Sequence, residues 1–187
     1  LFGVAATVLL AQMKKWTFAV MTVAGCGTAI LAAGITPPNT DTTELVRRWE
    51  TAYGWLDVVR SPADGSLAIR QNLHYRHGST AAATREYRQG RLPLLLHPHP
   101  TDVAFLGLGT GLTAAPAVAD GEVESVVVVE LIPEVGEAAR LLKAANLNVV
   151  DHPKVEVRID DARHHLLRTE RQYDVIVADL FVPWESK

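Results

Sequence analysis

Four short apolar runs in the second half of the chain constrain its fold more than any other feature. Each run has the length of a buried strand, and helix-length segments separate the runs. This alternation predicts a parallel sheet built from strand–helix–strand units, because parallel neighbours need a long crossover connection. The runs are Val103–Leu106, Val126–Val129, Val155–Ile159 and Val175–Ala178.

A different pattern precedes these runs. Trp55–Arg60 and Leu67–Leu73 are rich in Val, Ile and Leu, and Ser61–Gly65 between them contains Pro and Asp-Gly. Such turn chemistry between two apolar runs predicts a small antiparallel β unit. Residues 44–52 are interpreted as a short helix or a polar approach segment, and Arg85–Leu96 as a helix that ends at a Pro-rich break.

The start of the chain differs from both of these regions. Trp16–Thr40 contains no charged residue, and Thr17–Ile35 is apolar or small throughout, close to the ~20 residues that cross a bilayer. This predicts a transmembrane segment. Two alternatives are a signal peptide with a lipoprotein-like box at Val23–Cys26 and a buried soluble helix. Basic pairs lie on both sides of the apolar segment, so the positive-inside rule leaves its orientation undetermined.

Composition excludes several classes of protein. The 187 residues carry 18 basic and 21 acidic side chains, a net charge of −3, which argues against a basic nucleic-acid surface. The only cysteine, Cys26, excludes an internal disulfide and a Cys-based zinc site. Histidines occur in pairs without a convincing third ligand, so no metal is expected.

The first apolar run of the predicted parallel sheet ends in a glycine-rich turn, Gly107-Leu-Gly-Thr-Gly111, which should open a helix at about Leu112. Glycines allow a ligand to approach the backbone closely, and the N–H groups of a helix start can point at it. The dinucleotide fingerprint would need a third glycine where Leu112 stands, so an NAD site is not favoured. The alternative is a tight turn without a ligand.

Acidic residues end the other three runs. Glu130 lies 19 residues after Gly111, the spacing at which an acid grips ribose hydroxyls. Asp160 and Asp161 could accept from an adenine amino group, although Asp161 could also be a helix N-cap. Asp179 follows the last run and is a candidate general base, with an apolar stretch, residues 180–184, that could cover a ligand.

Taken together, these motifs resemble the spermidine synthase (polyamine aminopropyltransferase) superfamily, and within it a bacterial membrane-linked branch. The resemblance covers residues 53–187. It is carried by Tyr53-Gly-Trp55, Leu92-Pro-Leu-Leu-Leu-His-Pro98, the glycine turn Gly107–Gly111, Val127-Val-Val-Glu130, Ile159-Asp-Asp-Ala162 and Tyr173-Asp-Val-Ile-Val-Ala-Asp-Leu-Phe181.

The resemblance implies an α/β fold, an AdoMet-methyltransferase-like Rossmann sheet preceded by a small β-hairpin domain. It implies that decarboxylated AdoMet binds and that an aminopropyl group passes to an amine. By position, Glu130 would hold the ribose, Asp161 the adenine, and Asp179 would accept the proton of the attacking amine. The expected nucleoside site comprises Gly107, Gly109, Gly111, Glu130, Asp160, Asp161 and Ala162, and the weaker substrate set comprises Tyr53, Glu86, Tyr87 and Thr110.

Three positions depart from the family pattern. Thr110 stands where true spermidine synthases carry an acid that holds the amine, and Val182 stands where they carry a second acid before the proline. Tyr53-Gly54 replaces their Tyr-Gln pair. These departures put putrescine as a substrate in doubt but leave nucleoside binding intact. Arg85–Arg88 is interpreted as a solvated helix face, with Glu86 or Tyr87 lining the amine pocket as the alternative.

The expected organisation is a transmembrane segment at 1–38, a linker at 39–52, a β domain with its connecting helix at 53–100 and a Rossmann-like domain at 101–187. The sheet is expected to be C-terminally truncated, with an unpaired edge on its fourth strand. The alternative functions are an AdoMet-dependent methyltransferase and an inactive membrane-tethered nucleoside-binding protein. The expected partners are a small amine, the bacterial inner membrane and a second copy in a homodimer, with no nucleic acid.

Overall fold

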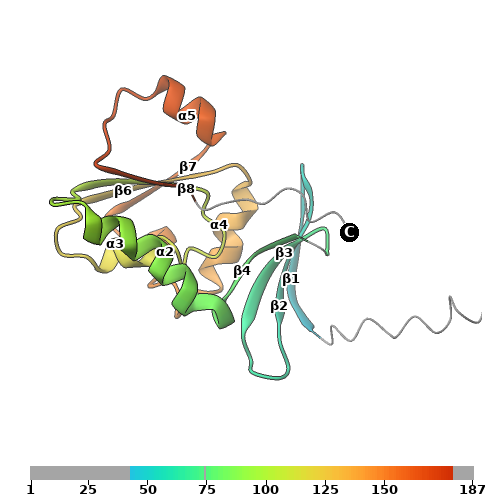
Figure 1. Ribbon diagram of the computed structural model, residues 1–187. Coiled ribbons are helices and arrows are strands. Elements are labelled where there is room, and N and C mark those ends of the chain that lie inside the picture. The colour runs from blue at the N-terminus through green and yellow to red at the C-terminus, as the bar shows by residue number, and fades with distance from the viewer. Residues whose placement is uncertain (1–42, 74, 179–187) are drawn as a thin grey trace, which may run out of the picture. The chain divides into compact units, whose positions relative to one another are not determined.

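The computed structural model describes residues 43–73 and 75–178, which form two four-stranded sheets joined by a long helix (Figure 1). The predicted transmembrane segment and Asp179 lie outside these residues. No helix within them is long and apolar enough to cross a membrane. The strands are β1 (Glu44–Thr51), β2 (Gly54–Arg60), β3 (Leu67–Gln71), β4 (Tyr75–Ser79), β5 (Asp102–Leu106), β6 (Ser125–Glu130), β7 (Val155–Ile159) and β8 (Val175–Ala178), and the helices are η1 (Thr80–Ala82), α2 (Ala83–Leu96), α3 (Ala115–Ala119), α4 (Pro133–Arg140), η2 (Val149–Asp151) and α5 (Ala162–Arg168).

The first sheet is antiparallel, in the order β1-β2-β3-β4. The predicted hairpin of β2 and β3 is confirmed, with its turn closed by the Gly65 N–H, which donates to the Ser61 carbonyl at 2.9 Å. The interpretation of residues 44–52 as a helix or an approach segment is wrong, because most of that segment is strand β1, paired with β2. Strand β4 was not expected. Neither β1 nor β4 has an alternating apolar pattern in its own sequence. Each forms a strand because it pairs with a neighbour, β1 with β2 and β4 with β3.

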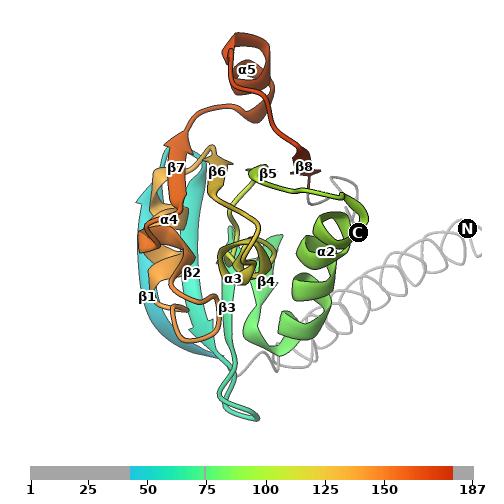
Figure 2. The ribbon, with the colours of Figure 1, turned by 90° about the vertical axis from the view of Figure 1, so that its left-hand side faces the viewer.

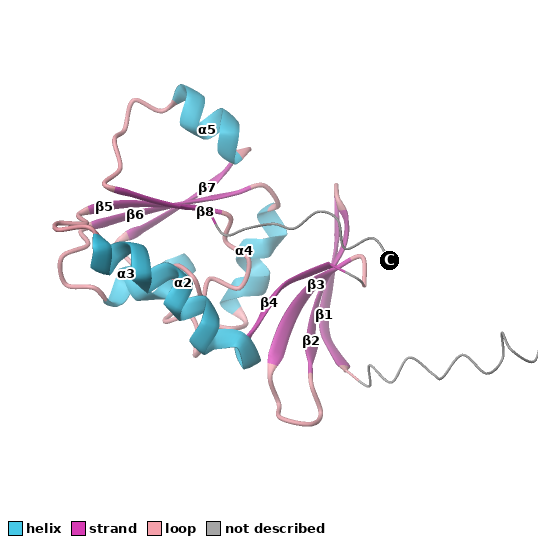
Figure 3. Cartoon of the chain, viewed as in Figure 1, coloured by secondary structure: helices cyan, strands magenta, loops and turns pink. Residues whose placement is uncertain are grey.

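The second sheet is parallel, in the order β7-β6-β5-β8, and confirms the four predicted strands. Helices α2, α3 and α4 lie on one face and α5 on the other (Figure 3). The valines of β6, Val126–Val129, are at most 1% exposed, which is typical of a strand covered on both faces. Within the part of the chain that the structure describes, β8 pairs with β5 alone and forms an edge of the sheet.

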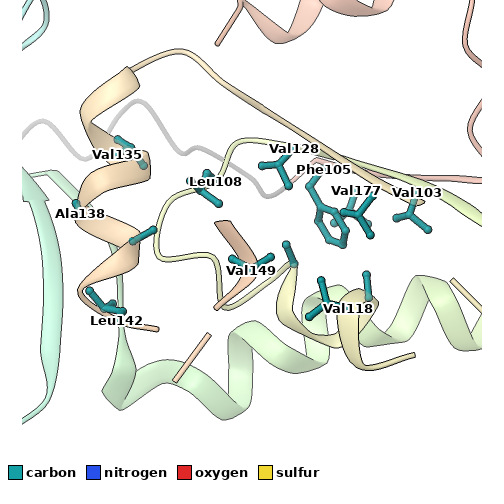
Figure 4. Packing of buried hydrophobic residues seen from close by; sticks show 14 of the residues in the cluster. Val103, Phe105, Leu108, Val118, Val128, Val135, Ala138, Leu142, Val149 and Val177 are labelled. Carbon is teal, nitrogen blue, oxygen red and sulfur yellow. The ribbon is translucent and has the colours of Figure 1, made fainter. Parts of the chain in front are cut away.

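One apolar core joins the two sheets. Leu56 and Ile69 of the antiparallel sheet belong to the same buried cluster as Phe105 of β5 and Val135 of α4. Figure 4 shows the part of this cluster that contains Phe105 and Val135. Trp49 on β1 strengthens this junction, because its indole Nε1–H donates to Glu137 Oε2 on α4 at 2.8 Å. The antiparallel sheet is therefore packed against the helical layer of the parallel sheet, and β4 leads through η1 into α2 (Figure 2).

Candidate functional site

The carboxyl ends of the parallel strands bring the predicted motifs to one edge of the sheet. The glycine turn follows β5, Glu130 ends β6, and Asp160 follows β7. Backbone hydrogen bonds connect these ends: the Gly107 N–H donates to the Val129 carbonyl at 2.8 Å, and the Asp160 N–H donates to the Glu130 carbonyl at 3.0 Å. In open parallel sheets this edge is where ligands bind.

The three glycines of the turn all have positive φ, 102° at Gly107, 51° at Gly109 and 77° at Gly111. Their surroundings differ. A Cβ on Gly109 would lie 2.9 Å from the carbonyl oxygen of His77, and one on Gly111 would lie 2.5 Å from Val149 Cγ1, whereas one on Gly107 would meet nothing within 4 Å. Gly107 is thus the open position, while Gly109 and Gly111 permit close packing inside the protein.

The helix expected to begin at about Leu112 begins later. Helix α3 starts at Ala115 and has five residues, and residues 112–114 form turns. The helix start expected at Leu112 is therefore wrong by three residues, and turns follow Gly111 directly. The main features of the candidate site are the exposed backbone at Gly107 and the carboxylate of Glu130 at the end of β6.

Glu130 is fixed in place by backbone amides. Its Oε2 accepts from the Leu108 N–H in the glycine turn at 2.9 Å, and its Oε1 accepts from the Ile132 N–H at 2.9 Å. The residue is only 6% exposed. Each carboxylate oxygen can accept two hydrogen bonds, so one acceptor position on each oxygen remains available for a hydroxyl. This rigid pair of acceptors suits the two adjacent hydroxyls of a ribose.

Asp160 and Asp161 shape the start of α5. Asp161 is the N-cap, because its Oδ1 accepts from the His164 N–H at 2.9 Å, and Ala162 is the first helical residue. This hydrogen bond lowers the pKa of Asp161. Asp160 Oδ1 accepts from the Asp161 N–H at 2.9 Å. The capping role of Asp161 is thus present, and its adenine role stays a prediction.

The segment interpreted as a solvated helix face includes a buried acid. Glu86 on α2 is 6% exposed, and its Oε2 accepts from the Thr110 hydroxyl at 2.6 Å. Its Oε1 accepts from the Ser79 N–H at 3.3 Å. Glu86 therefore lies at the glycine turn, and its alternative role as a lining residue of the amine pocket stays a prediction. The predicted solvated face is thus present at Arg85 and Arg88, which are exposed, and wrong at Glu86, which contacts β4 and the turn.

The two tyrosines of the expected substrate set lie elsewhere. The Tyr87 hydroxyl donates to the Ala145 carbonyl, and its ring lines a cavity of about 470 Å³ with Arg91 and Leu147. Tyr53 is 47% exposed in the β1–β2 turn, where its carbonyl accepts from the Gln71 side-chain amide at 2.8 Å. Their substrate roles stay predictions.

Two residues beside the glycine turn were not expected there from the sequence, although His77 belongs to one of the histidine pairs that were considered as metal ligands. His77 lies with its carbonyl against Gly109, and its Nε2 is 3.2 Å from Gln71 Oε1. Burial lowers the pKa of His77, and the Glu130 carboxylate opposes this effect. Asn146 is fully buried, and its amide Nδ2 donates to the Thr110 carbonyl at 2.8 Å, which holds the glycine turn from behind. No spacing in the sequence signals either contact.

No cluster of three or more metal-binding side chains occurs among residues 43–73 and 75–178. Glu130 accepts from two backbone amides, and Glu86 accepts from a hydroxyl and a backbone amide. That set of partners is suited to binding an organic ligand with hydroxyl or ammonium groups.

Comparison with known proteins agrees with this geometry. The spermine/spermidine synthase domain matches residues 89–186. The polyamine aminopropyltransferase of Bacillus subtilis is 30% identical over 134 residues, which cover 72% of this chain and 48% of the relative. That of Methanocaldococcus jannaschii is 36% identical over 88 residues, covering 47% of this chain and 30% of the relative.

Solved structures show the same fold. Spermidine synthase from Thermotoga maritima superimposes with a TM-score of 0.66 at 23% identity, over 74% of this chain and 47% of the other. A spermidine synthase in complex with the transition-state analogue AdoDATO gives 0.65 at 23% identity, over 72% and 47%. The chain thus spans about half the length of the relatives it matches. Since the family match extends over more than half of its residues, the chain belongs to the spermine/spermidine synthase domain family.

Proposed function

We propose that this chain carries the nucleoside-binding part of an aminopropyltransferase, which transfers an aminopropyl group from decarboxylated AdoMet to an amine. The observation that carries the proposal is the fixed carboxylate of Glu130 beside the open backbone of Gly107. A ribose can donate both hydroxyl protons to this carboxylate while the nucleoside lies over the glycine turn. Family membership supplies the reaction class.

The reaction needs little from the protein beyond binding, orientation and a base. The amine nitrogen attacks the methylene carbon attached to the sulfonium, a C–N bond forms, the C–S bond breaks, and sulfur leaves as a neutral thioether. The amine must first give up a proton, because an ammonium has no lone pair. We assign this proton to the carboxylate of Asp179, by its position directly after β8.

The proposed roles of Asp160, Asp161 and Ala162 are to bind the adenine beside β7. Asp161 Oδ1 accepts the capping hydrogen bond of α5. We therefore assign Asp161 Oδ2 as the acceptor for the adenine amino group. We also propose that the protein works at the bacterial inner membrane and as a homodimer. The support for the membrane is the uncharged sequence 16–40.

Calorimetry on the full-length protein tests the function directly. Decarboxylated AdoMet should bind more tightly than AdoMet, and Glu130→Ala should abolish binding of both. A preference for AdoMet would instead indicate a methyltransferase. If neither compound binds, the enzyme proposal is wrong and a tethered domain without catalysis remains.

A further inference from the structure

One side of α2 carries exposed side chains that the proposed reaction does not use. The buried residues of this helix, Glu86, Gly90 and Leu94, are spaced four apart and lie on its inner side. The opposite side, which we call the outer face, consists of exposed residues at the i, i+3 and i+4 spacing of one helical face. The outer face comprises Arg85, Arg88, Arg91, Leu92, Leu95 and Leu96.

The arginines of the outer face have no acidic partner within the part of the chain that the structure describes. Arg85, Arg88 and Arg91 form no hydrogen bond or ion pair there. Arg48 and Arg140, by contrast, each pair with an aspartate. The one acidic residue of α2 is buried on its inner side. The outer face therefore presents three positive charges that no acid of the same helix balances.

The leucines occupy the C-terminal half of the outer face. Leu92 is 59% exposed, Leu95 66% and Leu96 77%. A hollow of about 440 Å³ at the N-terminal half is lined by Arg85, Arg88 and Leu92, among others. Arginine binds phosphate through two parallel N–H donors, and leucine gains free energy when it leaves water for acyl chains. The outer face thus combines the two side-chain types that bind the surface of a phospholipid bilayer.

Helix α5 provides a comparison within the same protein. It also exposes a leucine and an arginine, Leu167 at 72% and Arg168. However, acids lie at both of its ends, because Asp161 is its N-cap and Glu170 follows it. These acids would be repelled by an anionic surface. Helix α5 lies on the opposite face of the parallel sheet from α2 (Figure 3).

We propose that the outer face of α2 docks on a bilayer that contains anionic phospholipid, with its arginines at the phosphates and its leucines at the acyl boundary; this rests on the membrane location proposed above. The uncharged sequence 16–40 ends four residues before β1 begins, so an anchor there keeps the domain close to a bilayer. Each basic residue near an anionic membrane surface adds to binding, so charge complementarity selects the anionic lipid.

The test uses the full-length protein in nanodiscs, with a photoreactive benzophenone side chain in place of Leu95. The discs contain phosphatidylcholine alone or with about 30% phosphatidylglycerol, and we expect cross-linking to lipid to rise at least about fivefold with the anionic lipid. Mass spectrometry identifies the cross-linked molecule. Arg85→Gln combined with Arg88→Gln should remove most of this rise. Arg163→Gln combined with Arg168→Gln, the same charge change at exposed positions of α5, is the matched control and should keep it.

The outcomes separate this inference from the proposals on which it rests. Equal cross-linking in both kinds of disc, or an unchanged rise in the Arg85 and Arg88 variant, would overturn docking through α2 but leave the membrane location in place. A cross-link to a second copy or to another part of the chain would assign the outer face to protein contact and would also overturn it. A protein that stays with neither disc would contradict both the membrane location and this inference. No readout involves decarboxylated AdoMet, so each result holds whether or not aminopropyl transfer is detected.

Discussion

The two sides of the glycine turn are built by different means. At the end of β6, Glu130 is held by the N–H groups of Leu108 and Ile132, which the strand ends supply. At the junction of β4 and α2, Glu86 is held mainly by the side-chain hydroxyl of Thr110 and more weakly by the Ser79 N–H. Glu86 and Ser79 come from α2 and β4, which precede the parallel sheet in the chain. Backbone donors at strand ends follow from topology, whereas the junction depends on how closely α2 and β4 pack. The junction is therefore the side that substitutions should disturb more easily.

The largest effect is expected at the contact between α2 and the loop after the glycine turn. A Cβ on Gly90 would lie 1.7 Å from the Thr113 carbonyl oxygen, so Gly90→Ala must displace the helix. We expect the free energy of unfolding to fall by about 3 kcal/mol. Chemical denaturation measures this.

The matched control is Gly136→Ala in α4, where a Cβ would meet nothing within 4 Å. This substitution should be neutral or stabilise by up to about 1 kcal/mol, because alanine favours helix. Similar losses at both positions would mean that the close approach at Gly90 is not what limits the junction.

The next effect sharpens the role of the β6 side. Glu130→Gln replaces one carboxylate oxygen by an NH2 group, which cannot accept from the backbone N–H that faces it. The glycine turn loses a hydrogen bond, and the ribose loses a charged acceptor. We expect the affinity for decarboxylated AdoMet to fall by about 10- to 100-fold in calorimetry. Glu124→Gln, an exposed acid just before β6, serves as the control. Unchanged affinity in Glu130→Gln would remove Glu130 from the nucleoside site.

A smaller effect tests the junction from the side of the turn. Thr110→Val keeps the shape of the side chain but removes the hydroxyl that donates to Glu86. The loss of one donor to a buried carboxylate should lower the free energy of unfolding by about 1–2 kcal/mol. Thr84→Val, at an exposed position of α2, should stay within about 0.5 kcal/mol. Combined with Glu86→Gln, Thr110→Val should cost less than it does alone, since the charge it serves is gone.

The smallest effect concerns the N-cap of α5, the exposed residue Asp161. It follows β7, the strand that pairs with β6. The His164 N–H holds the pKa of Asp161 below its usual range, so the cap stabilises α5 fully above the ordinary carboxyl pKa of about 4. That contribution is lost as pH falls through the lowered pKa. Hydrogen exchange of the α5 amides should therefore speed up at acidic pH in the wild type, after correction for intrinsic rates.

Asp161→Ala should show fast exchange in α5 at neutral pH already and little further change in acid. Glu170→Ala, at an exposed acid after the helix, is the control and should keep the pH dependence. If Asp161→Ala retained that dependence, another group would be the source of it.

Sequence patterns predicted the parallel strands because each contains a local apolar pattern, continuous in β5, β6 and β8 and alternating in β7. The run Val126–Val129 has that character whatever its neighbours are, and the acid and glycines at the strand ends follow in fixed order. Strand β1, with the sequence ELVRRWET, is mostly exposed and carries no such pattern. It becomes a strand because β2 offers an edge to pair with, a fact that no local window contains.

The same division holds inside the site. The sequence by itself determined that the glycine turn, Glu130 and Asp160 meet at one edge, because parallel strands place their carboxyl ends together. Only the tertiary structure decided that Glu86 is buried and that His77 touches Gly109, since these contacts join segments 24 and 32 residues apart through packing of α2 and β4. The position of each parallel strand along the chain follows from local hydrophobicity, whereas the burial of one charged side chain depends on which surface a helix is packed against.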